Sequence, residues 1–140
     1  MTAEREQDEG LFGLGGRRLL VVEEDEGCAC AVRRWLEICG ARVSTAASIG
    51  TALTSVRCEA PDLLLLDVRL PDGSAWDLLD RLRASVPGGA DVPVVAMTAR
   101  DGSTVTQAAH AHGVRHVLTR PIAPAALAEA LSQCLDVGCS

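Results

Sequence analysis

Short apolar runs alternate with longer amphipathic stretches along this chain. The runs are bounded by turn residues, a pattern typical of strands that are buried on both faces of a sheet. In the stretches between them, apolar residues recur at helical spacing. We expect strands at 19–22, 42–46, 63–66, 93–97 and 115–118. We expect helices at 27–39, 48–58, 74–86, 103–112 and 125–136.

Five strands that alternate with five helices through short connections predict an α/β fold with a doubly wound parallel sheet. The 140 residues are enough for one domain with a sizeable core. The four leucines at 63–66 form an all-apolar run, so we predict that they make a central strand. Ligands of open α/β sheets gather at the carboxyl ends of the strands, so polar residues there are candidates for function.

Polar residues follow four of the predicted strands. They are Glu23 and Glu24 after the first strand, Asp67 after the leucine run, Thr98 after the fourth and Arg120 after the fifth. Carboxylates in the first loop would repel a nucleotide phosphate, and they suit a hard cation with oxygen ligands. Two simpler interpretations stay open, namely an aspartate that caps a turn or helix and acidic residues that favour a helix N-terminus. Convergence of these side chains at one sheet edge favours a functional site.

Charge and hydropathy narrow the classes of partner. The net charge is -6 and the predicted pI is about 5.0, whereas proteins that bind nucleic acid normally present a basic face. No apolar run approaches the roughly 20 residues that span a bilayer, and the acidic N-terminus is unlike a signal peptide. We therefore expect no contact with nucleic acid or membrane, and a cytoplasmic location.

The two ends of the chain differ in composition from the predicted domain. Residues 1–16 join an acidic segment to a glycine-rich one that buries too little surface to order itself, so we expect a flexible N-terminal arm. We place the domain at 17–136 and a short C-terminal tail at 137–140. Because nothing after this domain resembles an output domain, we expect it to act alone.

The spacing of cysteine and histidine gives little sign of a metal site. The six cysteines form no C-x2-C pair and have no histidine near them in sequence, so we expect no zinc site and mostly buried thiols. A spacing of two puts His110 and His112 on different faces of a helix. We expect both of them, and His116, to lie on the surface.

Four motifs that occur in order give the chain a family resemblance. They are VVEED after the first strand, LLLLDVRLPDG around Asp67, MTA after the fourth strand and TRPI after the fifth. With these motifs the chain resembles the receiver domain of two-component response regulators over about 17–136. The resemblance implies a flavodoxin-like receiver fold with strand order 2-1-3-4-5. It also implies a signalling domain and not a turnover enzyme.

The resemblance implies a role for three residues at the strand ends. Asp67 resembles the phosphoacceptor, whose carboxylate takes a phosphoryl group from a sensor histidine kinase or a histidine phosphotransfer protein. Thr98 and Arg120 would each contact a phosphoryl oxygen. Phosphorylation would then change the face formed by the last strand and the two helices around it. A downstream protein, or a second copy of the chain in a homodimer, would recognise that face.

The same resemblance implies a Mg²⁺ site. Glu24 and Asp67 would ligate the cation together with the backbone carbonyl of Arg69, and Glu23 would hold metal-bound waters. The cation is needed because carboxylates repel the charged oxygens of a phosphoryl group. The family usually has Asp-Asp or Glu-Asp where this chain has Glu-Glu, and the extra methylene of Glu24 predicts weak Mg²⁺ binding.

Two further residues differ from the family pattern, so other functions stay open. Arg120 replaces the lysine of the family, and Val117 stands where an aromatic residue is usual. The domain could therefore be a degenerate receiver that works through protein contacts without phosphorylation. Two other classes are disfavoured. A phosphatase of the haloacid dehalogenase type needs a second aspartate where Arg69 stands, and the acidic loop 23–26 would repel the phosphate of FMN in a flavodoxin-type protein.

Overall fold

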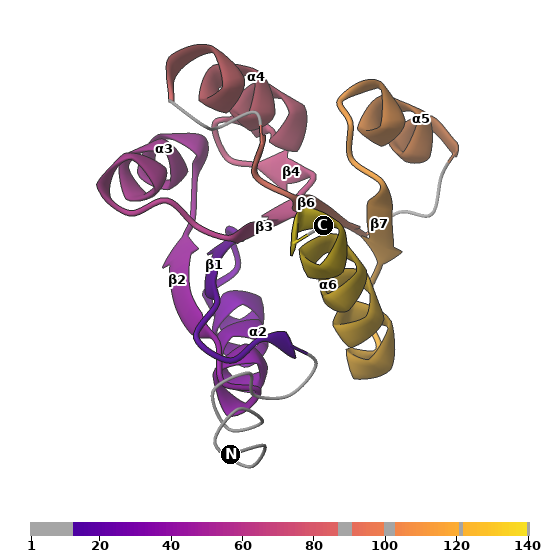
Figure 1. Ribbon diagram of the computed structural model, residues 1–140. Coiled ribbons are helices and arrows are strands. Elements are labelled where there is room, and N and C mark those ends of the chain that lie inside the picture. The colour runs from indigo at the N-terminus through magenta and orange to yellow at the C-terminus, as the bar shows by residue number, and fades with distance from the viewer. Residues whose placement is uncertain (1–12, 87–90, 100–102, 121, 140) are drawn as a thin grey trace.

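A five-stranded parallel sheet forms the middle layer of the molecule (Figure 1). The computed structural model describes residues 13–86, 91–99, 103–120 and 122–139. The strands of the sheet are β1 (Arg18–Val22), β2 (Arg42–Ala46), β3 (Leu63–Asp67), β6 (Val94–Thr98) and β7 (His116–Thr119). Their order is β2-β1-β3-β6-β7, and every neighbouring pair is parallel.

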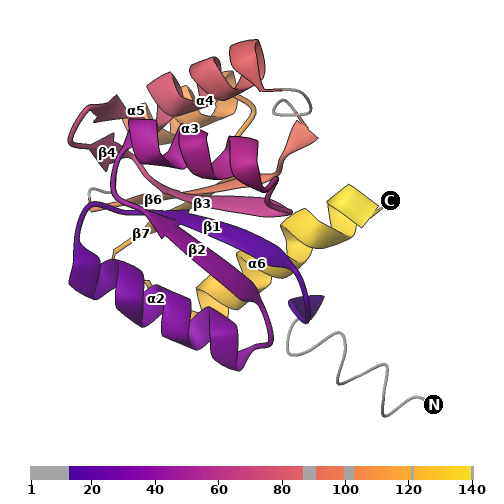
Figure 2. The ribbon, with the colours of Figure 1, turned by 90° about the vertical axis from the view of Figure 1, so that its left-hand side faces the viewer.

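Helices cover both faces of this sheet (Figure 2). On one face lie α3 (Ile49–Cys58), α4 (Ala75–Ser85) and α5 (Ser103–Ala111). On the other face lie α2 (Glu26–Ile38) and α6 (Pro124–Cys139). Five helices around a five-stranded parallel sheet confirm the predicted doubly wound α/β fold.

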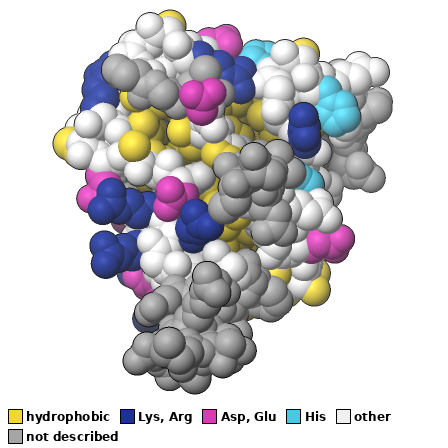
Figure 3. All heavy atoms as spheres, viewed as in Figure 1, with side chains coloured by type: hydrophobic (Ala, Val, Ile, Leu, Met, Phe, Trp, Pro, Cys, Tyr) yellow, Lys and Arg dark blue, Asp and Glu magenta, His cyan; other side chains and the backbone are white. Residues whose placement is uncertain are grey.

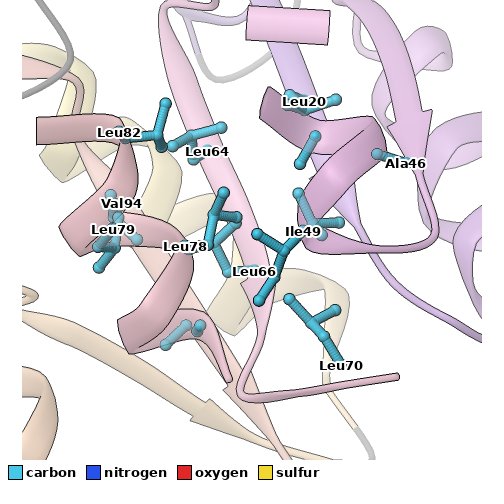
Figure 4. Close-up of a cluster of buried hydrophobic side chains, with 14 of the residues drawn as sticks. Leu20, Ala46, Ile49, Leu64, Leu66, Leu70, Leu78, Leu79, Leu82 and Val94 are labelled. Atoms are coloured by element: carbon cyan, nitrogen blue, oxygen red, sulfur yellow. The ribbon is translucent and has the colours of Figure 1, made fainter. Parts of the chain in front are cut away.

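The run of four leucines forms the middle strand, as predicted. Each of these leucines is at most 1% exposed. Because side chains alternate along a strand, Leu64 and Leu66 pack into the cluster beneath α3 and α4, while Leu63 and Leu65 pack into the cluster beneath α2 and α6. Figure 4 shows the first of these clusters, in which leucines of α4 meet those of β3. The uniform hydrophobicity of β3 therefore follows from two buried faces.

Side-chain caps fix where three helices begin. Ser48 and Thr51 form a capping box at the start of α3, and Ser74 and Asp77 form another at the start of α4. Asp25 accepts a hydrogen bond from the N–H of Cys28 at the start of α2. The residues that cap α2, α3 and α4 therefore satisfy N–H groups that a helix leaves without an internal partner.

Two short strands were missed by the sequence analysis. β4 (Arg69–Leu70) and β5 (Gly73–Ser74) pair antiparallel to each other, outside the large sheet. Strands of two residues are too short to show an alternating pattern, so the sequence predicted only a turn here. Because of this hairpin, the predicted order 2-1-3-4-5 becomes β2-β1-β3-β6-β7 when all strands are numbered along the chain.

Both ends of the described chain are more ordered than predicted. Leu14 is fully buried beneath α2 and α6, and the N–H of Gly16 donates to the carbonyl of Gly40. Residues 13–16 of the predicted arm therefore pack on the domain, because the composition of a segment does not reveal one well-placed leucine. Residues 1–12 lie outside the described residues. At the other end, α6 continues to Cys139, three residues beyond its predicted end at 136.

The expectation that most thiols are buried is wrong for the described cysteines. Of the five, all free, only Cys39 and Cys134 are buried, whereas Cys30 is half-buried. Cys28 and Cys58 are exposed because they lie on the outer surfaces of α2 and α3.

Among the residues that the structure describes, every helix is too short or too polar to cross a lipid bilayer.

His112 is also less exposed than predicted. Its ring stacks on Trp76 of α4, with 5.3 Å between the ring centroids and 22° between the planes. Its Nδ1 lies 2.8 Å from the carbonyl oxygen of Ala108, and its Nε2 lies 3.7 Å from Oδ1 of Asp80. Helical spacing could not predict this placement, because the partners Trp76 and Asp80 come from another helix.

Candidate functional site

The register of the sheet brings the predicted site residues to neighbouring strand ends. Val22 lies beside Leu66 and Thr98 beside Thr119, so the residue after each of these strands reaches the same edge. The four residues gathered there are Glu23 after β1, Asp67 at the end of β3, Thr98 at the end of β6 and Arg120 after β7. This is the carboxyl edge of the sheet, where α/β proteins usually bind ligands.

Arg120 connects two carboxylates at this edge. Its guanidinium donates a hydrogen bond to Oε1 of Glu23, and its Nη2 lies 3.6 Å from Oδ2 of Asp67. The side chain of Glu23 is only 3% exposed, that of Asp67 18% and that of Arg120 26%. The three charged groups therefore form one partly desolvated cluster, in which Coulomb interactions are stronger than on an open surface.

The cluster carries more negative than positive charge. Burial, together with the neighbouring Asp67 carboxyl, raises the pKa of Glu23 from 4.5 to about 7, and the Arg120 guanidinium only partly opposes this. Burial disfavours the charge of Arg120, but its hydrogen bond to Glu23 and the two carboxylate charges raise its pKa overall. One guanidinium is thus too little to neutralise both acids, so the site can accept a further proton or cation.

Main-chain hydrogen bonds hold the strand ends in place around Asp67. The N–H of Arg120 donates to the carbonyl of Thr98 at 2.8 Å, and the N–H of Val68 donates to the carbonyl of Met97 at 2.9 Å. The N–H of Arg69 donates to Oδ1 of the Asp67 side chain at 3.2 Å. Thr98 is itself only 6% exposed. The carboxylate of Asp67 is therefore oriented by backbone groups and not only by Arg120.

The remaining acids of the first loop take different positions. Glu24 is exposed, whereas Asp25 caps α2 and Glu26 lies in the first turn of that helix. No group of three His, Cys, Asp or Glu side chains in the described part of the chain is arranged to hold a metal ion. The structure thus unites Glu23, Asp67 and Arg120 and leaves Glu24 outside this cluster.

The two converging carboxylates nevertheless fit a Mg²⁺ ion by their chemistry. Mg²⁺ prefers oxygen ligands, and it is usually bound by one or two carboxylates while it keeps several waters. Burial raises the pKa of Glu23 most and the neighbouring Asp67 carboxyl adds to this, so a divalent cation between the two acids would favour their charged forms. The donor set at the ends of β1 and β3 is therefore suitable, although Arg120 already contacts both acids.

An open cleft of about 440 Å³ lies beside this cluster. Glu23 is at one side of it, and α2, the end of β2 and the start of α3 supply the rest of its lining. Arg33, Glu26 and Thr51 are among the lining residues, so the cleft presents both signs of charge. Asp67 is not part of this lining, so the cleft flanks the site and does not contain it.

Among the described residues, charges of both signs are mixed on the face seen in Figure 3. Arginine and acidic side chains lie side by side on the left of this view, with hydrophobic side chains visible between them. Such mixing gives little of the long-range attraction that steers nucleic acid to a protein.

One residue near the site was missed by the sequence analysis. Asp72, in the hairpin that follows Asp67, accepts hydrogen bonds from the first two N–H groups of α3. The Pro-Asp-Gly turn in the sequence marked a bend but gave no sign of the helix it would meet. Only the tertiary structure brings these two segments together.

Comparison with known proteins places the chain in one family. The model of the response regulator receiver domain matches residues 19–132. An uncharacterized 14.6 kDa protein of Leptolyngbya boryana is 35% identical over 115 residues, which cover 82% of this chain and 87% of that protein. The regulatory protein LuxO of Vibrio vulnificus is 34% identical over 101 residues, which cover 72% of this chain and 22% of LuxO. The chain thus spans only a minor part of LuxO.

Comparison with solved structures indicates the same family. A putative response regulator from Chloroflexus aurantiacus superposes with a TM-score of 0.80 at 28% identity, over 86% of this chain and 98% of that one. The receiver domain of a sensor histidine kinase from Pseudomonas aeruginosa, with a magnesium ion coordinated in its active-site cleft, gives a TM-score of 0.78 at 25% identity, over 87% and 99%. This chain therefore belongs to the response regulator receiver domain family.

Proposed function

We propose that this receiver domain accepts a phosphoryl group on Asp67. The observation that carries the proposal is the cluster at the carboxyl edge, where the guanidinium of Arg120 contacts both the partly exposed Asp67 and the buried Glu23. A phosphoacceptor must be reachable by its donor, and the side chain of Asp67 is 18% exposed while that of Glu23 is 3% exposed. Asp67 is therefore the carboxylate of this pair that an incoming phosphoryl group can reach.

The transfer itself is a single displacement. A carboxylate oxygen of Asp67 forms a bond to phosphorus while the phosphorus–nitrogen bond of a phosphohistidine breaks. The leaving imidazole keeps the electron pair of that bond and takes a proton from solvent. Thr98 would donate its hydroxyl to one phosphoryl oxygen, and Arg120 would pair with another through its guanidinium. These donors act on charge that the phosphoryl oxygens carry through the transition state.

Four groups at the carboxyl edge of the sheet would hold a Mg²⁺ ion. Its protein ligands would be Glu24, Asp67 and the carbonyl of Arg69, and Glu23 would hold metal-bound waters. When bound, the cation offsets the repulsion between carboxylates and phosphoryl oxygens. We expect its affinity to be weak, because Glu24 is exposed and Arg120 already contacts the two converging acids. The Glu-Glu pair and Arg120 make this an atypical variant of the receiver site.

The proposed signal passes through the face formed by α5, β7 and α6. A sensor histidine kinase or a histidine phosphotransfer protein would supply the phosphoryl group, and a downstream protein or a second copy of the chain would recognise this face. Val117 of β7 is half-buried against the cluster beneath α3, α4 and α5. Since it lacks the ring of the aromatic residue usual in the family, we expect a smaller rearrangement of this face. The domain would act in the cytoplasm as a signalling module and not as a turnover enzyme.

A specific contact favours a second candidate function. Because Arg120 contacts both Glu23 and Asp67, the site holds a counter-charge of its own even without a metal ion. In a degenerate receiver that binds partners without phosphorylation, this contact would take over part of the role of the cation. The two functions differ in whether Asp67 reacts.

Intact-mass spectrometry tests the proposal. The protein is incubated with acetyl phosphate and Mg²⁺, alongside Asp67→Ala and an EDTA control. A single phosphoryl adduct on the wild type that is absent from both controls supports the phosphoacceptor. If the wild type gains no adduct while circular dichroism shows it folded, the degenerate receiver becomes the better account.

A further inference from the structure

The hairpin that follows Asp67 is tied to a helix from an earlier part of the chain. Asp72 lies in the turn between β4 and β5. Its carboxylate accepts hydrogen bonds from the N–H of Ile49, at 2.8 Å, and from the N–H of Gly50, at 3.2 Å. These two residues begin α3, where N–H groups have no acceptor within the helix. Asp72 therefore acts as a cap for a helix to which it does not belong.

Two side chains together satisfy the first turn of α3. Ser48 accepts a hydrogen bond from the N–H of Thr51 at 3.2 Å, and Asp72 accepts from the two N–H groups before it. The hydrogen bond from Ile49 lowers the pKa of Asp72, so this carboxyl is ionised at neutral pH. A carboxylate at a helix N-terminus also interacts favourably with the helix dipole. The link between the hairpin and α3 is thus charge-assisted.

Packing holds the hairpin in the same place. Leu70 is 8% exposed and belongs to the same cluster as Ile49 and Leu66, which Figure 4 shows close together. Gly73 has a φ of +150°, and a Cβ added there would lie 2.8 Å from Cδ1 of Ile49. A side chain at Gly73 would therefore require Ile49 of α3 and Asp77 of α4 to shift, at a backbone φ that other residues rarely adopt.

The other end of the hairpin is part of the candidate site. The N–H of Arg69 donates to the Asp67 side chain, and the N–H of Val68 donates to the carbonyl of Met97 on β6. The main chain from Asp67 to Asp72 is thus anchored at one end to β6 and at the other to α3. A shift at Asp72 would be transmitted to the backbone of Arg69, three residues away.

We propose that Asp72 is a positioning residue that fixes the main chain of residues 67–70. Through that main chain it orients the carboxylate of Asp67 and the carbonyl of Arg69. The carboxylate of Asp72 binds the main chain at the start of α3, so its proposed effect on Asp67 passes through the hairpin. The consequence for phosphoryl transfer rests on the proposed function of Asp67, whereas the placement of the hairpin does not.

The test compares Asp72→Asn and Asp72→Ala with a matched control, Asp62→Asn. Asp62 also uses its carboxylate to accept a main-chain hydrogen bond, from the N–H of Arg18 at 2.8 Å. It lies just before β3 and contacts the start of β1, so it is at the opposite edge of the sheet from Asp67. All variants are studied well below their unfolding midpoints. Asp72→Asn keeps one acceptor oxygen and the size of the side chain, so it serves if the alanine variant does not fold.

Two measurements separate positioning from general stability. The first follows the amide NMR signals and hydrogen exchange of Arg69 in metal-free protein. The second is the rate of acyl phosphate formation with acetyl phosphate and Mg²⁺. We expect both Asp72 variants to shift the Arg69 signal and speed its exchange, and to slow the reaction by about tenfold, as is usual for residues that orient a site. Asp62→Asn should change neither measurement.

Each outcome decides one part of the proposal. An Arg69 amide that is unchanged in both Asp72 variants overturns the positioning role, whatever happens to phosphorylation. A shifted amide with a wild-type reaction rate overturns its relevance to phosphoryl transfer. If the amide shifts in the variants but the wild type takes no phosphoryl group, Asp72 still positions the hairpin and the proposed function of Asp67 is what fails.

Discussion

Replacing Glu23 with glutamine should stabilise the metal-free protein, and more strongly at pH 8 than at pH 5. The Glu23 carboxyl is 3% exposed and shares its surroundings with the carboxyl of Asp67. Burial and this neighbour disfavour its charged form more than the Arg120 guanidinium favours it. Glutamine has nearly the same shape and no charge, so it removes the repulsion while it keeps the packing.

The pH dependence has a definite sign. The pKa of Glu23 is raised from 4.5 to about 7, so the folded protein binds this proton more tightly than the unfolded chain does. The resulting stabilisation is fully present below about pH 4.5 and is lost as the pH rises through about 7. The difference between the two pKa values corresponds to about 3 kcal/mol at most. The advantage of Glu23→Gln should therefore grow by about 2 kcal/mol between pH 5 and pH 8.

Urea denaturation followed by tryptophan fluorescence measures this advantage. Both proteins are unfolded at pH 5 and at pH 8 in the presence of EDTA, and the free energies of unfolding are compared. Glu26→Gln is the matched control, because Glu26 is an exposed acid in the first turn of α2. A gain for Glu23→Gln that is the same at both pH values would refute the reasoning, as would an equal pH dependence in the control.

Three further predictions concern the site, the hairpin and the core. Arg120→Ala should tighten Mg²⁺ binding roughly fivefold or more in a calorimetric titration. The reason is that the positive charge of Arg120 would repel a nearby cation by at least about 1 kcal/mol. Unchanged or weaker Mg²⁺ binding would contradict this prediction. Gly73→Ala should lower the free energy of unfolding by about 2 kcal/mol, since an alanine Cβ would clash with Ile49 at a strained φ; wild-type stability would contradict the close approach. Leu65→Ala should lower the free energy of unfolding, measured by urea denaturation, by about 2–5 kcal/mol, because Leu65 is fully buried. Ile38 is 75% exposed, so Ile38→Ala should lower it far less.

The strands of the sheet could be predicted because each is either a short apolar run that is buried on both faces or a short run that turn residues clearly bound. The leucines of 63–66 predicted the central strand, and the polar residue after it indicated the edge where the candidate site lies. Glu23, Thr98 and Arg120 could be assigned to the same edge because parallel strands end together. Their residue types and order also carried the family resemblance, which the comparison with receiver domains bears out.

What the sequence could not reveal depends on contacts between distant segments. The pairing of Arg120 with Glu23 joins residues 97 positions apart, and the cap that Asp72 gives to α3 spans 23 positions. The stacking of His112, the residue after α5, on Trp76 of α4 also joins distant segments. The spacing of apolar residues describes one helix or strand at a time. It therefore predicts which face of that element is buried, but not which side chains of other segments pack against that face.

The central claim is that the carboxylate of Asp67 is the group that takes the phosphoryl. Borohydride reduction of protein treated with acetyl phosphate and Mg²⁺ converts an aspartyl phosphate to homoserine, which peptide mass spectrometry can assign to a single position. The account predicts homoserine at position 67, in the wild type only when Mg²⁺ is present. Homoserine at another aspartate, or a phosphoryl adduct that persists in Asp67→Ala, would contradict it.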